Sequence, residues 1–144
     1  MLTDFLAEEL RRRGHEVQLA GPPADADLQW ADVAREVAQA VGDGSVDEGV
    51  LCCWTGTSVS IAANKVPGVR ASLCGDAETA RGARAWNDAN VLCLSLRTTT
   101  ETLADEMLDA WLSPIELDPQ ERENVDRLRA MAASRRGDRE EGLP

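Results

Sequence analysis

The chain has 144 residues, the length of one domain with a substantial hydrophobic core, and 43% of them are apolar. Its net charge of −11 argues against nucleic acid or an anionic membrane surface as a partner, because both require a basic face. No apolar run approaches the roughly 20 residues needed to span a bilayer, so the sequence favours a cytoplasmic globular protein.

The first elements along the chain are predicted to be a helix, a strand and a second helix. Residues 2–13 have leucine and phenylalanine at helical spacing, and Gly14 follows them as a C-cap would. Residues 15–21 predict a short strand. Residues 28–44 predict an amphipathic helix that packs Trp30 against the core.

From residue 49 onward, apolar strands alternate with helices. The expected strands cover residues 49–54, 68–75 and 90–95, and the expected helices cover residues 58–66, 76–88 and 99–113. Asp76 and either Thr99 or Thr100 are the expected N-caps, and Trp111 is expected to pack in the core. The strands are continuous apolar runs rather than alternating ones. We therefore predict an α/β fold in which helices cover both faces of a parallel sheet.

The chain divides into three parts by its pattern of apolar residues. Residues 1–113 are expected to form the domain, and the apolar pattern weakens after Pro114. Residues 114–133 predict a charged helix with a thin apolar stripe, and residues 134–144 predict a solvated, disordered tail.

The four cysteines are not arranged as a metal site. No C-x-x-C pair occurs and His15 is the only histidine, so we expect no metal. Cys52, Cys74 and Cys93 lie inside apolar runs and are expected to be buried thiols. Cys53 differs from them because it lies at the end of its strand.

Ligands of open parallel sheets bind beyond the carboxyl ends of the strands, and the end of the strand at 49–54 is chemically distinctive. Four small residues precede the next helix there, so backbone N–H groups can receive negative charge: Thr55, Gly56, Thr57 and Ser58. The thiolate of a cysteine at such a position, here Cys53, is stabilised. Small-residue loops before helices are common, so this pattern alone does not identify a substrate.

Longer stretches of the sequence indicate a protein family more specifically than this loop pattern does. "SIAANKVPGVRA", "NDANVLCL" and "DAWLS" occur in the order and spacing of the type B ribose-5-phosphate isomerases and the galactose-6-phosphate isomerase subunits, which the chain resembles over about residues 1–113. The resemblance implies a flavodoxin-like αβα sandwich with strand order 2-1-3-4-5. It also implies a homodimer or tetramer with shared active sites. The implied reaction is aldose–ketose isomerisation of a sugar or sugar phosphate through an enediolate, without metal or organic cofactor.

The resemblance assigns roles to several residues. It implies that Cys53 is the general base and that Thr55 and Gly56 belong to a loop that cradles the oxyanion. Thr57 and Ser58 continue that loop, and Ser58 stands where the family has its last glycine. The implied substrate contacts farther along the chain are Asn87 and, for the phosphate, Arg97.

The chain also departs from the family pattern. Trp54 replaces a loop glycine, and Trp86 replaces the histidine that opens the sugar ring; an indole N–H donates a hydrogen bond but cannot transfer a proton. Gln120 and Asn124 stand where phosphate-binding arginines are expected, with arginines nearby at positions 122 and 127. We expect Trp54 and Trp86 to line the pocket together as an aromatic wall.

Two further expectations come from the resemblance. Members of the family begin with a strand that lies between those at 15–20 and 49–54, and its apparent absence here predicts a gap in the sheet or a truncated start. Two functions remain open. One is an aldose–ketose isomerase, an intramolecular oxidoreductase; the other is a non-catalytic homologue that acts as a partner subunit or as a sugar-binding protein.

Overall fold

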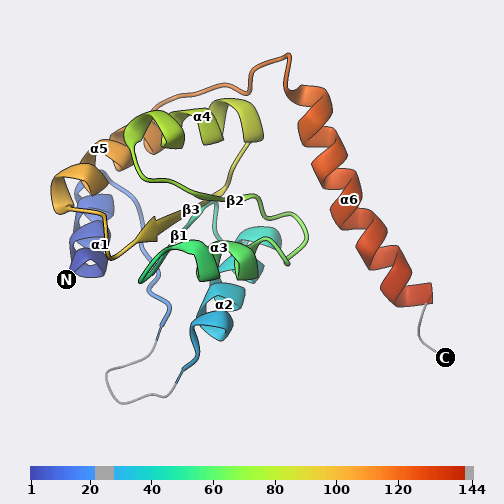
Figure 1. The fold of residues 1–144 in the computed structure, drawn as a ribbon, viewed down its shortest axis with the longest axis horizontal. Helices are drawn as coiled ribbons and strands as arrows, with labels where there is room; N and C mark the ends of the chain where they lie inside the picture. Colours follow the sequence, from blue (N-terminus) through green and yellow to red (C-terminus); the bar gives the residue numbers. More distant parts are fainter. Residues whose placement is uncertain (22–27, 142–144) are drawn as a thin grey trace.

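The computed structural model describes residues 1–21 and 28–141 (Figure 1), with side chains up to residue 133. Within these residues the elements are, in chain order, α1 (Leu2–Arg12), α2 (Trp30–Gly42), β1 (Gly49–Cys53), α3 (Thr57–Ala63), β2 (Ala71–Leu73), α4 (Ala77–Asn87), β3 (Val91–Ser95), α5 (Glu101–Leu112) and α6 (Arg122–Glu141). None of the described helices is both long and apolar enough to cross a membrane.

The three described strands form a parallel sheet in the order β1-β3-β2. Its register pairs Gly49 with Val91 and Cys53 with Ser95. The expected order 2-1-3-4-5 would place the strand at residues 71–73 between the strands at 49–54 and 90–95. The structure places β3 in that central position instead, so this detail of the prediction is wrong. All five residues of β3 are buried, as a central strand requires, whereas β2 has three residues that are all partly or fully exposed.

Helices cover both faces of this sheet, which confirms the three-layer α/β sandwich. Helices α1, α4 and α5 pack on one face around Leu92 and Leu94, while α2 and α3 pack on the other around Val91 and Cys93 (Figure 1). The connection through α3 crosses past β3 to β2, and the connection through α4 returns to β3. Right-handed crossovers in opposite directions place their helices on opposite faces.

The two tryptophans expected in the core have different outcomes. Trp111, in the last turn of α5, is 1% exposed and packs in the core, as predicted. Trp30 is 53% exposed, so its predicted packing is wrong. Helix α2 approaches the sheet through the small residues Ala34 and Ala38, which are fully buried, and the indole of its first turn remains outside.

The predicted helix termini are confirmed. The Asp76 carboxylate accepts a hydrogen bond from the Thr79 N–H at 2.7 Å, and the Thr100 hydroxyl accepts one from the Leu103 N–H at 3.1 Å. Gly14 follows α1 with φ 90°, the left-handed conformation of a helix C-cap. Helix α6 runs to Glu141, past residue 133, where a tail was expected to begin.

The two outer edges of the sheet differ. At β2, the Asn64 side chain donates to the Ala71 carbonyl at 2.9 Å and accepts from the Ala71 N–H at 2.8 Å, so the amide occupies this edge. At β1, no described strand lies on the outer edge. Residues 15–20 form no strand, contrary to expectation, because a strand needs a neighbour for its backbone hydrogen bonds.

Candidate active site

The carboxyl ends of β1 and β3 form the crevice where a ligand is expected. The two strands are neighbours, but β1 continues into α3 on one face of the sheet and β3 continues toward α5 on the other. Ligands bind at such a topological switch point because the two loops diverge and leave a gap. A depression of about 260 Å³, the carboxyl-end cavity, lies here and includes Thr55, Ser95 and Arg97.

Cys53 is the last residue of β1 and is partly exposed; it does not itself line this cavity, which begins two residues farther along the chain at Thr55. Its Sγ accepts a hydrogen bond from the Gly56 N–H at 3.1 Å, a contact that stabilises negative charge on sulfur. The geometry therefore favours a reactive thiol at the position expected for the base.

The other three thiols are held in the protonated form. Burial, followed by the nearby Cys53, raises the pKa of Cys52 to about 11. Burial also raises the pKa of Cys74 to about 11 and that of Cys93 to about 12. Cys74 and Cys93 are buried as expected, whereas Cys52 is only partly buried because β1 is an edge strand.

Gly56 is required by the backbone geometry of the loop. Its φ is 77°, and a Cβ at this position would lie 2.9 Å from the Leu94 carbonyl carbon and 2.5 Å from Leu73 Cδ1. A side chain is therefore excluded both by conformation and by space. The close approach to β3 turns the Gly56 N–H toward the Cys53 sulfur.

The rest of the loop is fixed by bonds to β3. The Trp54 carbonyl accepts hydrogen bonds from the Arg97 N–H at 3.0 Å and the Ser95 hydroxyl at 2.9 Å, while the Trp54 side chain is 67% exposed. The hydroxyls of Thr55 and Thr57 lie 2.6 Å apart. Ser95 was not anticipated from the sequence, although it is the one hydroxyl at the end of an apolar strand.

Ser58 and Arg97 complete the predicted residues at this end of the sheet. Ser58 is partly buried in the first turn of α3. Arg97 is exposed and lines the carboxyl-end cavity, and it makes no ion pair with any residue in the described part of the chain. Its guanidinium is therefore available to an anion.

Trp86 and Asn87 lie at the opposite end of the sheet. They end α4, which returns to the amino end of β3 near Val91, whereas Cys53 pairs with Ser95 at the other end of that strand. Four residue spacings at about 3.3 Å separate the two ends by about 13 Å. Within one chain, the expected aromatic wall of Trp54 and Trp86 is therefore wrong.

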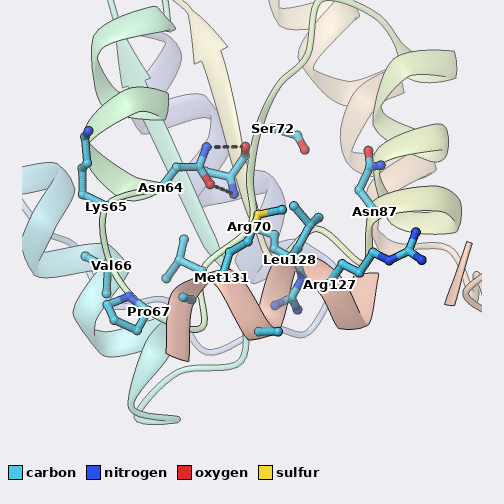
Figure 2. Close-up of a pocket in the computed structure, with 14 residues that line it drawn as sticks. Asn64, Lys65, Val66, Pro67, Arg70, Ser72, Asn87, Arg127, Leu128 and Met131 are labelled. Atoms are coloured by element: carbon cyan, nitrogen blue, oxygen red, sulfur yellow. Dashed lines mark hydrogen bonds between the residues drawn. The ribbon is translucent and has the colours of Figure 1, made fainter. Parts of the chain in front are cut away.

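A second and larger cavity lies on the side of Asn87. This amino-end cavity measures about 970 Å³ and lies between α6 and the segment that connects α3 to β2 (Figure 2). Asn87 and Arg127 line the same cavity, together with Lys65 and Arg70. Gln120 and Asn124, which occupy the expected arginine positions, do not line it, and among the α6 side chains described up to residue 133 the cation that lines it is Arg127.

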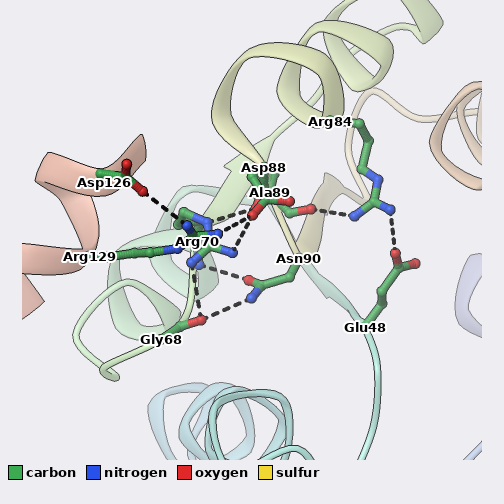
Figure 3. A network of polar contacts seen from close by, with 9 residues as sticks. All are labelled: Glu48, Gly68, Arg70, Arg84, Asp88, Ala89, Asn90, Asp126 and Arg129. Atoms are coloured by element: carbon green, nitrogen blue, oxygen red, sulfur yellow. Dashed lines mark hydrogen bonds and ion pairs between the residues drawn. The ribbon is translucent and has the colours of Figure 1, made fainter. Parts of the chain in front are cut away.

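The turn that follows Asn87 is held by two arginines (Figure 3). Asp88 has φ 48°, a strained conformation for a residue with a side chain. Its carbonyl accepts from Arg70 Nε at 2.7 Å, and the next carbonyl, that of Ala89, accepts from Arg84 Nη1 at 2.6 Å. Strain of this kind persists only where the surroundings fix the backbone, so Asn87 is presented in one defined position.

The same turn is anchored to α6 and to the core. The Asp88 carboxylate pairs with Arg70 at 3.2 Å and with Arg129 of α6 at 2.7 Å. Arg84 pairs with Glu48 at 2.8 Å and stacks over the Trp111 ring, with its guanidinium carbon 5.1 Å from the ring centre. The turn that positions Asn87 is therefore held by contacts with the segment before β2, with α6 and, through Arg84, with the segment before β1.

The Trp86 side chain packs against its own helix, α4, over Gly82. A Cβ at Gly82 would come within 2.6 Å of the indole of Trp86, so the absence of a side chain at Gly82 makes room for the ring. The other face of the indole is open, since the residue is 57% exposed. In the described part of the chain, no cluster of side chains could hold a metal ion.

Comparison with known proteins shows the family of the chain. The profile of the Ribose/Galactose Isomerase family matches residues 1–130. The chain is 39% identical to ribose-5-phosphate isomerase B of Escherichia coli over 112 residues, which are 78% of this chain and 75% of the relative. It is 37% identical to D-erythrulose-4-phosphate isomerase of Pectobacterium atrosepticum over 77% of this chain and 74% of the relative.

The fold is similar to solved structures of the same kind. Ribose-5-phosphate isomerase B of Clostridium thermocellum superposes with a TM-score of 0.87 at 35% identity, over 92% of this chain and 90% of that one. The Mycoplasma genitalium enzyme with bound ribulose 5-phosphate superposes with a TM-score of 0.84 at 34% identity, over 92% of this chain and 88% of that one.

Proposed function

Because the chain belongs to the ribose/galactose isomerase family, we propose that it interconverts an aldose phosphate and its ketose through an enediolate, with Cys53 as the general base. The observation that carries the proposal is the Cys53 sulfur, held 3.1 Å from the Gly56 N–H at the carboxyl ends of β1 and β3. This thiol lies where the topology opens the sheet to a ligand.

In the proposed reaction, the thiolate of Cys53 removes the proton from the carbon next to the carbonyl. The electron pair of the broken C–H bond moves to the carbonyl oxygen and gives the enediolate. Backbone N–H groups of the loop at residues 55–58 stabilise this oxyanion, and Arg97 binds the phosphate. The thiol returns the proton to the neighbouring carbon while a proton moves between the two substrate oxygens, so no external reactant is consumed.

We further propose that two copies of the chain form each complete site. Asn87 and Arg127 share the amino-end cavity, at the opposite end of the sheet from Cys53, so a second copy must supply them if they contact the same substrate. A homodimer, alone or within a tetramer, meets this requirement, and so does pairing with a related subunit. A thiol base also has to stay reduced, which favours the cytoplasm.

Solvent proton exchange tests the proposed chemistry. The protein is incubated in D2O with ribose 5-phosphate, ribulose 5-phosphate and D-erythrulose 4-phosphate, and NMR follows loss of the C–H signal next to the carbonyl. Cys53→Ala should lower the rate by about 10²-fold or more, while the matched control Cys52→Ala should keep most of it. Equal rates in the two variants, or no exchange in the wild type, would contradict Cys53 as the base.

Mixing inactive variants tests the shared site. Cys53→Ala and Asn87→Ala proteins, each inactive alone, should regain up to about a quarter of the wild-type rate when they are unfolded and refolded together, because half of the mixed dimers' sites carry neither change. If the mixture stays inactive while size-exclusion chromatography shows dimers, each site belongs to a single chain.

A further inference from the structure

Ser95 places a buried hydroxyl at the point where β1 and β3 diverge. It is the last residue of β3, it is 8% exposed, and it pairs in register with Cys53, the last residue of β1. Alternate residues of a strand share a face, so Ser95 lies on the face of Val91 and Cys93, against which Cys53 also packs. The hydroxyl is therefore a neighbour of the proposed base. A polar group buried at such a place costs free energy unless it is hydrogen-bonded.

The Ser95 hydroxyl makes two hydrogen bonds, and they join two loops. It donates to the Trp54 carbonyl at 2.9 Å and accepts from the Thr98 N–H at 3.3 Å. The first bond holds the loop that follows Cys53, and the second holds the loop that contains Arg97. The single hydrogen of the hydroxyl is already donated, so it is not available to a substrate.

The Trp54 carbonyl is the point where the loop leaves β1. Its second donor in the described part of the chain is the Arg97 N–H, at 3.0 Å. Only Thr55 separates Trp54 from Gly56, whose N–H donates to the Cys53 sulfur at 3.1 Å. A shift of the Trp54 carbonyl therefore displaces the N–H that stabilises negative charge on sulfur.

We infer that Ser95 is a positioning residue, whose hydroxyl holds the Trp54 carbonyl so that the Gly56 N–H stays against the Cys53 sulfur. This role rests on the proposed function, in which Cys53 is the base. Groups that carry out a reaction have to be held by neighbours that are themselves fixed. Without the hydroxyl, the Trp54 carbonyl keeps one of its two donors, and the loop gains freedom while the sheet itself remains.

Two variants of nearly equal shape test the role of the hydroxyl. Ser95→Thr keeps it and Ser95→Val lacks it, and both carry the same added volume. In the D2O exchange assay with ribulose 5-phosphate, kcat should be about tenfold lower for Ser95→Val than for Ser95→Thr, because a buried hydrogen bond is lost beside the base. KM should differ by less than about threefold, because the Arg97 N–H still holds its loop to Trp54.

Two further variants guard against effects of volume and of general destabilisation. Ser95→Ala adds no atoms, so it should fold and should lower kcat as Ser95→Val does. Ser113→Ala is the matched control, because it removes a bond of 2.8 Å from a serine hydroxyl to the Ala110 carbonyl at the end of α5. It should keep the wild-type rate.

Hydrogen exchange of the Gly56 amide gives a readout that requires no activity. By NMR, this amide should exchange about tenfold faster in Ser95→Val than in Ser95→Thr, whereas the amides of α5 should exchange equally in both. A role in overall stability alone would change the amides of the whole domain together.

Equal kcat values for Ser95→Thr and Ser95→Val would overturn the inference while the proposed chemistry stands. Equal exchange of the Gly56 amide in the two variants would also overturn it, because the hydroxyl would then not hold the loop. If the wild type converts no sugar phosphate, the proposed function fails, and the Gly56 amide still decides whether Ser95 positions the loop beside Cys53.

Discussion

Replacing Gly56 with alanine tests whether the loop after β1 depends on its close approach to β3. The new Cβ would lie 2.5 Å from Leu73 Cδ1, 2.9 Å from the Leu94 carbonyl carbon and 3.1 Å from the Leu94 oxygen. Leu73 is 41% exposed and its side chain can rotate away. The Leu94 carbonyl belongs to the central strand and cannot move without breaking the sheet.

The expected cost has two parts. Alanine at φ 77° loses about 1–2 kcal/mol because its Cβ crowds the following carbonyl. The contact with the Leu94 backbone adds about 1–3 kcal/mol, the usual range for overpacking. The sum, about 2–5 kcal/mol, is a large share of the roughly 5–15 kcal/mol by which a domain is stable. The displaced loop should also lose its bond to the Cys53 sulfur and lower the isomerase rate.

Gly44 provides the matched control. Its φ is 82° and no atom lies within 4 Å of the position that a Cβ would take, so Gly44→Ala carries the conformational cost alone. Gly75→Ala, with no positive φ and no neighbour within 4 Å, should be nearly neutral. Urea denaturation of the three variants measures these differences. If Gly56→Ala costs no more than Gly44→Ala, the argument from the Leu94 contact is wrong.

The remaining predictions concern the thiols and Trp86. Brief iodoacetamide treatment near pH 8 should label Cys53 first, because burial raises the pKa of Cys74 to about 11 and that of Cys93 to about 12; mass spectrometry that finds either of these labelled first would contradict it. The free energy of unfolding should fall as the pH rises above about 9, because the unfolded chain ionises these thiols while the folded protein keeps them protonated. Urea titrations at about pH 8 and pH 10 measure this, and an equal stability at both would refute it. Gly82→Ala should displace the Trp86 indole, whose ring atoms lie 2.6 and 2.8 Å from the new Cβ, and shift the tryptophan emission at a cost below about 1 kcal/mol, since the exposed ring can rotate away. An unchanged emission spectrum would show that the ring does not lie there.

Local signals in the sequence predicted the helices well. Asp76 and Thr100 were identifiable as N-caps because a short side chain with an acceptor oxygen, placed just before a helical pattern, accepts a hydrogen bond from a backbone N–H of the first turn. The predicted strand order was wrong, because adjacency depends on which strand is buried most completely, and β3 differs from β2 in this respect only once the layers are assembled. Residues 15–20 have the composition of a strand, but composition cannot supply the neighbour that a strand requires.

The candidate site was predicted in part for a similar reason. Cys53 and Gly56 are close in sequence and lie in one loop, so the resemblance could place them in the same site, although the bond from the Gly56 N–H to the Cys53 sulfur was not predicted. Trp86 and Asn87 belong to a different strand connection, and the direction of α4 decides at which end of the sheet they lie. In a parallel sheet the helix between two strands runs back to the amino end of the next strand. Trp86 and Asn87, at the end of α4, therefore lie at the opposite end of the sheet from Cys53 within one chain.

The Asn64 amide has a consequence for how the protein associates. By bonding to both backbone groups of Ala71, it leaves no room for another strand at that point on the β2 side, while the outer edge of β1 has no described strand beside it. Fibrous growth through strand addition needs two receptive edges on every molecule, one to join the preceding copy and one to accept the next. A sheet that is receptive on one side alone can gain a single partner strand, and association by this route then terminates.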